Sequence, residues 1–340
     1  MKKRIIAGCL VACLLLTGAA GCNKTPGGEA SPTGYTDRAQ YMDAAVVTID
    51  GVPVGYREVM LYLQAAKQEY EGTYGDEIWN YVLKEDGETL GEWVTDETLE
   101  QVIYVKIVCA QAKKLGIELD SEEKSRVAER TEEYMGKAVY GTLSLYGIAR
   151  KDVERVYTDT ALAQKIYDSV TLNVDTDISN EEAAQKHLQS LMLKNYHVDE
   201  LGNRSSLTVQ ELIATLDRFD SLYKEAQTTK DFYSLAYANT EDKTYLDNMV
   251  GEGDLPEELA AAYGLSEGES MQIRTDSGYY IFYCVSGYDE DATIAKKEEL
   301  IALRQEETFR ELYEQWRGEA VIEVHESMKE TVGRDLKEGK

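Results

Sequence analysis

The sequence is poor in the side chains that build metal sites and nucleophilic active sites. Its 340 residues include only three histidines, and the spacing of His187, His197 and His325 is not that of metal ligands. We therefore expect no metal site. There is no Gly-x-Ser-x-Gly motif, and no histidine lies in a motif that would activate a serine or a cysteine. These absences disfavour a hydrolase, and no motif indicates a cofactor.

Basic residues are also scarce, with 36 lysines and arginines against 63 acidic residues and a net charge of −27. This charge disfavours binding to nucleic acid and electrostatic binding to anionic lipid, and it favours solubility. Phenylalanine is rare, with 4 residues, whereas tyrosine is abundant, with 24. Tyrosine joins an apolar ring to a polar tip, which suits surfaces that contact other chains. A simple compositional habit is the alternative explanation.

Cysteine beyond the first 22 residues is limited to Cys109 and Cys284. Both lie within apolar patterns, in regions that we assign to different domains. We therefore expect two buried thiols and no disulfide between them.

The first 21 residues have the three parts of a secretory signal. Lys2, Lys3 and Arg4 are followed by the apolar run 5–16 and by small residues that lead to Cys22. The run is too short to span a bilayer, which needs about 20 apolar residues. Ala19-Ala20-Gly21-Cys22 resembles a bacterial lipobox, although Ala19 stands where leucine is more usual. The resemblance implies a lipid on Cys22, and an ordinary secretory signal is the alternative.

Residues 22–40 have no apolar periodicity and contain two of the four prolines of the chain. This composition predicts a flexible tether. The protein is thus expected at the outer face of the bacterial cytoplasmic membrane, held there by its lipid.

The next part of the chain is mainly helical. Val46–Ile49 and Val52–Val54 are short β runs joined by an Asp50-Gly51 turn. One helix is predicted to start at Thr95 or Asp96 and to end at Gly116. Further helices are predicted after the capping box formed by Asp120 and Glu123 and over Lys151–Val170.

The pattern changes after residue 175 to mixed strands and helices, which is typical of a small α+β domain. Ser179 and Thr208 are predicted helix N-caps, and Asp199–Ser206 is predicted as a polar loop. The other expected elements are a strand at Leu188–Leu193, short helices at Asp231–Ala238 and Pro256–Tyr263, and a hairpin of Met271–Thr275 with Tyr279–Val285. A long helix at Thr293–Arg317 and a strand at Ala320–Val324 follow.

Several phrases occur in an order that matches a known family. Val46–Gly51 precedes Tyr56-Arg57-Glu58, and Lys106-Ile107 precedes Ala112–Ile117. In the second part Asp231–Ala236, Gly264–Glu269 and Thr275–Ile281 follow one another. In order and spacing the chain resembles the membrane-anchored foldases of the SurA and PrsA type, which carry parvulin-type peptidyl-prolyl isomerase domains.

The resemblance implies a predominantly helical α+β protein with a discontinuous architecture. A SurA-like helical chaperone domain would span residues 41–175 and be completed by 291–328. A small parvulin-like α+β domain, 176–290, would be inserted into it. The long helix and the last strand would return to pack on the N-terminal domain, and 329–340 would be a polar tail.

The resemblance also points to a peptide groove. Parvulin-type enzymes place one histidine on the first strand and another after the Gly-Tyr of the last hairpin, and here Ser190 and Tyr280 stand there. The methionine and phenylalanine of the family's proline groove correspond to Leu255 and Leu259. The groove candidates are thus Ser190, Met192, Leu255, Leu259 and Tyr280, and no catalytic residue is assigned. His187 precedes Ser190 by three residues, an offset that reverses its face on a strand.

The sequence therefore predicts an anchored chaperone or foldase that binds unfolded exported polypeptides, with its catalytic positions eroded. Trp79, Trp93 and the tyrosines are candidates for an apolar client surface, and core packing is the more common role of tryptophan. An active prolyl isomerase is the alternative, because isomerisation requires only preferential binding of the twisted amide. A solute-binding lipoprotein of a transporter is less favoured, because it requires two lobes of repeated strand–helix units.

Overall fold

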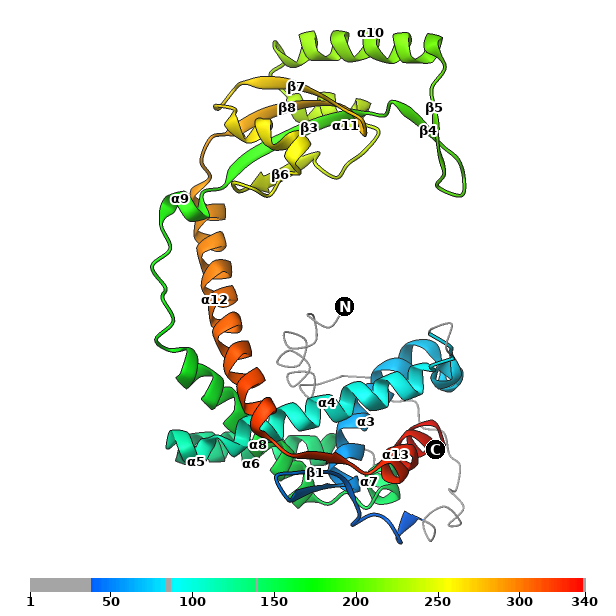
Figure 1. The fold of residues 1–340 in the computed structure, drawn as a ribbon, viewed down its shortest axis with the longest axis vertical. Coiled ribbons are helices and arrows are strands. Elements are labelled where there is room, and N and C mark those ends of the chain that lie inside the picture. Colours follow the sequence, from blue (N-terminus) through cyan, green and yellow to red (C-terminus); the bar gives the residue numbers. More distant parts are fainter. Residues whose placement is uncertain (1–37, 84–86, 139, 339–340) are drawn as a thin grey trace. The chain divides into compact units, whose positions relative to one another are not determined.

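The computed structural model describes residues 38–83, 87–138 and 140–338. The predicted signal, Cys22 and nearly all of the predicted tether lie outside the described residues. The chain divides into two compact units, one of residues up to Asn173 together with Gln305–Lys340, and one of Val174–Arg304. Helices outnumber strands in the described part of the chain, so the predicted α+β, predominantly helical class is confirmed (Figure 1).

The first unit packs helices against a small sheet. Strands β1 (Ala45–Ile49) and β2 (Val52–Gly55) form the predicted hairpin, with Asp50 and Gly51 in its turn. The helices of this unit before residue 174 are α3 (Tyr56–Tyr74), η3 (Asp76–Asn80), α4 (Leu90–Ala110), α5 (Ala112–Leu115), α6 (Ser121–Lys137), α7 (Tyr140–Leu145) and α8 (Arg150–Thr171).

The last part of the chain completes this unit. Strand β9 (Ile322–Val324) pairs antiparallel with β1, which gives the sheet order β2-β1-β9. Phe309, Tyr313 and Trp316 on α12 (Glu290–Glu319) join the same apolar core. The ring of Tyr104 on α4 lies 4.7 Å from that of Tyr313. Aromatic contacts between segments some 200 residues apart hold the returning chain in place.

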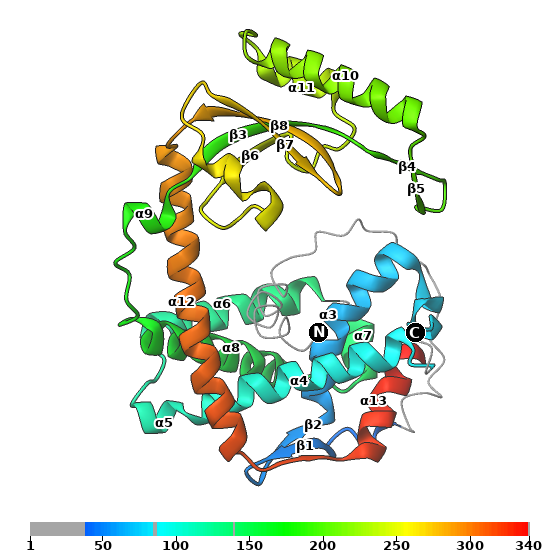
Figure 2. The same ribbon diagram turned by 45° about the horizontal axis from the view of Figure 1, so that its top comes forward.

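The second unit begins with α9 (Asn180–Ala183) and has a four-stranded antiparallel sheet of order β6-β3-β8-β7. Its strands are β3 (Lys186–Leu193), β6 (Asp247–Val250), β7 (Ser270–Thr275) and β8 (Gly278–Ser286). Helices α10 (Val209–Ala226) and α11 (Phe232–Asn239) cover one face, and the 3-10 helix η4 (Glu257–Gly264) lies on the other (Figure 2).

Local capping signals account for several element ends. Asp120 and Glu123 form a reciprocal capping box at α6, as do Thr208 and Glu211 at α10. Gly116 ends α5 in the left-handed conformation that glycine adopts without steric cost.

Two expectations about the elements were wrong, and one strand was missed. Helix α4 starts after Thr89, which forms a capping box with Glu92, and not at Thr95 or Asp96, because Thr95 is buried inside the helix. The predicted polar loop Asp199–Ser206 contains part of a hairpin, β4 (Tyr196–Val198) with β5 (Arg204–Ser206). Strand β6 was not predicted.

The expected polar tail 329–340 was also wrong. Residues Glu326–Glu338 form helix α13, in which Val332 and Leu336 are fully buried in the core of the first unit. Most of the charged residues around them are exposed or partly exposed, which made the segment look like a solvated tail, but Asp335 is buried with them. At the other end, Arg38 is buried and its Nε lies 3.3 Å from Asp335, so the packed unit already includes the end of the predicted tether.

We expect Leu336→Ala to lower the free energy of unfolding of the first unit by about 2–5 kcal/mol, because it leaves a cavity beneath α13. All three tryptophans, Trp79, Trp93 and Trp316, lie in this unit, so their fluorescence in urea reports its unfolding. Leu172→Ala, at an exposed position, is the matched control and should change stability by less than about 0.5 kcal/mol. Equal effects of the two substitutions would contradict the packing of α13.

Candidate functional site

The predicted groove residues lie on one face of the sheet of the second unit. Side chains alternate along β3, so Leu188, Ser190 and Met192 share the face that η4 covers, whereas Leu191 and Leu193 pack beneath α10 and α11. Met192 lies opposite Tyr280 on β8, and Ser190 lies opposite Phe282.

The structure brings four of the five candidates into one apolar cluster. Met192, Leu255, Leu259 and Tyr280 pack together, and Ser190 lies between Leu188 and Met192 on the same face. None of the five is more than 9% exposed. The open trough expected from the sequence is thus not seen in the described part of the chain, because these side chains fill the space themselves.

Ser190 is occupied by a structural hydrogen bond. Its Oγ donates to the carbonyl oxygen of Tyr245 at 2.6 Å, and its residue is almost fully buried. This bond gives a donor to a partly buried carbonyl, as is usual for polar groups inside a protein. It is therefore not free to bond a peptide unless that contact breaks.

Tyr280 is held as a neutral ring. Its ring stacks on that of Phe282, with centroids 6.1 Å apart. Burial raises the pKa of the Tyr280 phenol, and a hydrogen bond with Ser277 opposes the shift. With its pKa above that of an ordinary tyrosine, the phenol stays protonated at neutral pH and cannot act as a general base there.

The turn between β7 and β8 packs closely against the end of β3. Gly278 has φ 149°, and a Cβ at this position would lie 2.3 Å from Met192 Cε and 2.9 Å from the Leu193 carbonyl oxygen. In the same turn, Ser277 Oγ donates to Glu258 Oε1 at 2.8 Å. Ser277, Glu258 and Tyr245 thus hold the site, and the sequence did not indicate them because their partners are distant in the chain.

His187 does not join the groove candidates. Its Nε2 lies 2.7 Å from Asp247 Oδ1, an oxygen that also accepts a hydrogen bond from Gln189 Nε2. Successive side chains of β3 point to opposite faces of the sheet, so Gln189 lies on the face opposite to Ser190. The contact between His187 and Asp247 therefore lies away from the groove candidates. The cluster around Tyr280 therefore has no histidine that could transfer a proton.

In the described part of the chain, no group of three or more His, Cys, Asp or Glu side chains could hold a metal ion. Neither Cys109 nor Cys284 forms a disulfide with another described residue, and Cys109 Sγ donates to the carbonyl oxygen of Asp159 at 3.2 Å. Cys284 is buried, whereas Cys109 is only partly buried. Across the same residues, no helix combines the length and the apolar character that crossing a bilayer requires.

The two candidate tryptophans are not surface anchors. Trp79 is fully buried and its Nε1 donates to Glu71 Oε1 at 2.7 Å, which corrects the idea that it contacts clients. Trp93 is partly buried against the same core.

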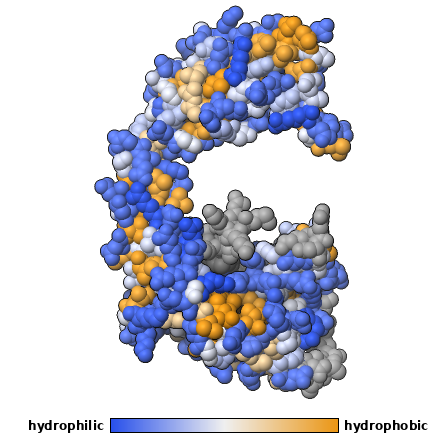
Figure 3. All heavy atoms as spheres, viewed as in Figure 1, coloured by the Kyte–Doolittle hydropathy of each residue, from blue (hydrophilic) through white to orange (hydrophobic). Residues whose placement is uncertain are grey.

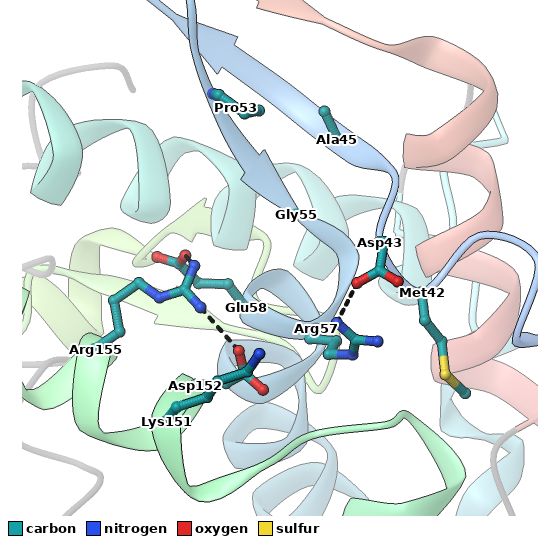
Figure 4. A pocket seen from close by; sticks show the side chains of 10 residues that line it. All are labelled: Met42, Asp43, Ala45, Pro53, Gly55, Arg57, Glu58, Lys151, Asp152 and Arg155. Atoms are coloured by element: carbon teal, nitrogen blue, oxygen red, sulfur yellow. Dashed lines mark hydrogen bonds and ion pairs between the residues drawn. The ribbon is translucent and has the colours of Figure 1, made fainter.

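A cavity of about 280 Å³ lies in the first unit, beside the β1–β2 hairpin (Figure 4). Most of its charged lining residues are paired with one another. Arg57 pairs with Asp43. Arg155 Nη2 lies 2.9 Å from Asp152 Oδ1, and Arg155 Nη1 lies 3.5 Å from Glu58 Oε2. The lining residues come from the segment before β1, from the hairpin and from the starts of α3 and α8: Met42, Asp43, Ala45, Pro53, Gly55, Arg57, Glu58, Lys151, Asp152 and Arg155.

Next to Glu58 of this cavity, a lysine whose side chain is 19% exposed joins three helices. Lys106 Nζ on α4 lies 2.6 Å from Glu58 Oε1 on α3 and 2.5 Å from Asp159 Oδ2 on α8. Burial alone would lower the pKa of Lys106, but the two carboxylates outweigh it and raise that pKa. A raised pKa means that the ion pairs stabilise the fold fully at neutral pH and are lost only as the pH rises through the folded-state pKa of Lys106. This arrangement is structural, since no nucleophile or histidine accompanies it.

Solved structures similar to this chain are PrsA proteins. One is the peptidylprolyl isomerase PrsA from Bacillus cereus, with 12% identity over 87% of this chain and 92% of that one and a TM-score of 0.31. The foldase protein PrsA from Streptococcus pneumoniae has 18% identity over 66% of this chain and 86% of that one, with a TM-score of 0.28.

A second Bacillus protein, PrsA from Bacillus anthracis, has 14% identity over 65% of this chain and 96% of that one, with a TM-score of 0.29. No family model matches the sequence, and no curated protein matches it. These PrsA proteins are foldases of the type that the sequence pattern resembles. Because the TM-scores are below 0.5, these similarities carry no information about the activity of this chain.

We expect Ser190→Ala to destabilise the second unit by about 1–3 kcal/mol, because the carbonyl of Tyr245 loses its buried donor. Hydrogen exchange at the β3 amides measures this change in a unit that has no tryptophan. Ser206→Ala, on the exposed strand β5, is the control and should leave exchange unchanged. If the two variants exchanged alike, the Ser190 hydroxyl would have no structural role.

We expect Lys106→Met to lower the free energy of unfolding of the first unit by about 3 kcal/mol, because Asp159 loses its cation and Glu58 keeps only Arg155, 3.5 Å away. Tryptophan fluorescence in urea measures it. Lys113→Met, on an exposed turn of α5, removes the same charge without burying a carboxylate and should have little effect. A stability equal to that of the control would mean that the ion pairs do not matter to the fold.

Proposed function

We propose that this chain is an extracytoplasmic chaperone of the foldase type, anchored by a lipid on Cys22, that holds unfolded exported polypeptides without isomerising their prolines. The observation that carries the holding role is an exposed apolar segment in the first unit. Between the end of α3 and the start of α4, Tyr74 is 67% exposed and Tyr81 is 62% exposed, and Val82 and Leu83 are also exposed.

This segment is held open by backbone contacts. The amide of Leu83 donates to the carbonyl of Glu88 at 2.8 Å, and Val82 bridges Thr89. The side chains that follow Tyr81 are therefore presented on a short β-like connection and not in the core. Clustered exposed apolar residues of this kind are a feature of protein-binding surfaces.

The packing of the sheet face argues against catalysis. Rotation of an X–Pro bond crosses a barrier of about 18–20 kcal/mol, which an enzyme lowers by binding the twisted amide better than the planar one. Here Ser190 is bonded to Tyr245, and Met192, Leu259 and Tyr280 are buried among themselves. No side chain of this cluster is placed to receive a twisted amide.

An active prolyl isomerase remains the second candidate function. It would require the segment 251–265 to move away from the sheet, so that Leu255 and Leu259 line a groove. The solute-binding alternative is disfavoured, because the first unit has a three-stranded sheet and the second an antiparallel one, and neither consists of repeated strand–helix units.

We expect the mature protein to suppress aggregation of a chemically unfolded client of near-neutral net charge at a roughly stoichiometric ratio, because exposed apolar side chains shield those of the client. Light scattering measures suppression, and a protease-coupled peptide assay on the same preparation measures isomerisation. Tyr81→Ser with Leu83→Ser should weaken suppression, whereas Leu172→Ser with Val321→Ser, at two other exposed positions of the same unit, should not.

Two outcomes would overturn the proposal in different ways. Scattering equal to that of the client alone would remove the holding role. Isomerisation above the uncatalysed rate, abolished by Tyr280→Ala, would instead establish the second candidate.

A further inference from the structure

The N-terminal half of α10 carries an apolar stripe that the described residues leave open. Val209 is 73% exposed and Ile213 is 55% exposed, and Leu212 and Leu216 are only partly buried. These four residues have the i, i+3, i+4, i+7 spacing that places side chains on one side of a helix. Single exposed aliphatic residues are ordinary, but a full stripe is not.

The stripe continues into the core of the second unit. In the C-terminal half of α10, Phe219, Leu222 and Ala226 are buried beneath the sheet with Leu191 and Ile281. Figures 1 and 2 show why the other half is open, because α10 reaches past the sheet on the side of its N-terminus. The helix thus keeps its apolar side where the fold provides nothing for it to cover.

The β4–β5 hairpin extends this open side. Val198 and Leu201 on the hairpin are exposed, and His197 Nε2 lies 3.3 Å from Glu211 Oε2 on α10. Figure 3 shows apolar side chains gathered over the N-terminal half of α10 and at the tip of the hairpin. Together Val198, Leu201, Val209, Leu212, Ile213 and Leu216 are called the α10 surface.

Acidic groups accompany the α10 surface. Asp199 and Glu200 lie in the hairpin, and Glu211 and Asp217 lie on α10. Hydrogen bonds from Thr208 and His197 lower the pKa of Glu211 to about 2, and hydrogen bonds from Asn203 lower that of Asp199. Both groups are therefore ionised at neutral pH. Residues 174–304 as a whole contain 26 acidic and 11 basic residues, which adds to the negative potential.

We propose that the α10 surface binds basic amphipathic segments of client polypeptides, with their apolar side chains on the stripe and their lysines and arginines toward the acids. This deepens the proposed holding function and rests on it. Charge complementarity selects the occupant, because it accelerates association with basic segments and repels acidic ones. The same argument disfavours a second copy of this acidic chain and an anionic membrane surface.

The test uses the full mature protein and two labelled 18-residue peptides that form amphipathic helices. Both carry leucine at one helical side, and the remaining positions are lysine in one and glutamate in the other. Fluorescence anisotropy should show binding of the lysine peptide alone, weakened about threefold or more when salt is raised from 50 to 300 mM. Val209→Ser with Ile213→Ser should reduce its affinity about tenfold.

A matched variant and a folding check accompany this test. Ile294→Ser with Leu303→Ser removes two similarly exposed aliphatic residues of α12 in the same unit and should leave the affinity unchanged. Far-UV circular dichroism should be the same for all three proteins, because none of the replaced side chains is buried.

Three results would overturn the inference. The first is equal binding of both peptides. The second is a loss of affinity in the α12 variant as large as that in the α10 variant. The third is a concentration-dependent dimer, seen by sedimentation, that Ile213→Ser abolishes. Failure of the holding function is distinguished by the aggregation assay with a near-neutral client. Suppression there without lysine-peptide binding would remove only the α10 surface, and no suppression would remove the function on which it rests.

Discussion

The buried carboxylate of Asp335 ties together the two ends of the helical unit. It accepts hydrogen bonds from the hydroxyls of Tyr56 at 2.5 Å and Tyr41 at 3.0 Å, and it pairs with Arg38. A charge this deeply buried is tolerated only when such partners surround it. Because the partners come from the start of α3 and the described residues before it, and Asp335 comes from α13, these contacts form only after the chain has returned.

That return explains how a second unit can be inserted without disturbing the first. Strand β9 adds to β1, and aromatic side chains of α12 pack on Tyr104, so the first unit closes on itself. The second unit has its own apolar clusters on both faces of its sheet. In one of these clusters, the residues that would line a peptide groove pack against one another. Binding is therefore assigned to exposed surfaces and not to the sheet face.

Much of the local structure could be predicted from short-range signals. Examples are the capping boxes at Asp120 and Thr208 and the left-handed Gly116. Each depends on residues within a few positions of one another, so it can be recognised from the sequence. Helix α13 could not be predicted in this way, because its two apolar residues Val332 and Leu336 are meaningful only against a core built from residues nearly 300 positions earlier.

The candidate site could likewise be predicted only in part from the sequence. Alternation along β3 was enough to place Ser190 and Met192 on one face, and the odd offset was enough to separate His187 from them. Whether that face is a groove or a packed core depends on where η4 and the β7–β8 turn lie. Sequence by itself determined the periodicity, the caps and the charge, which are properties of neighbours in the chain. Only the tertiary structure decided burial and exposure, because these depend on which distant segments come to lie against each face.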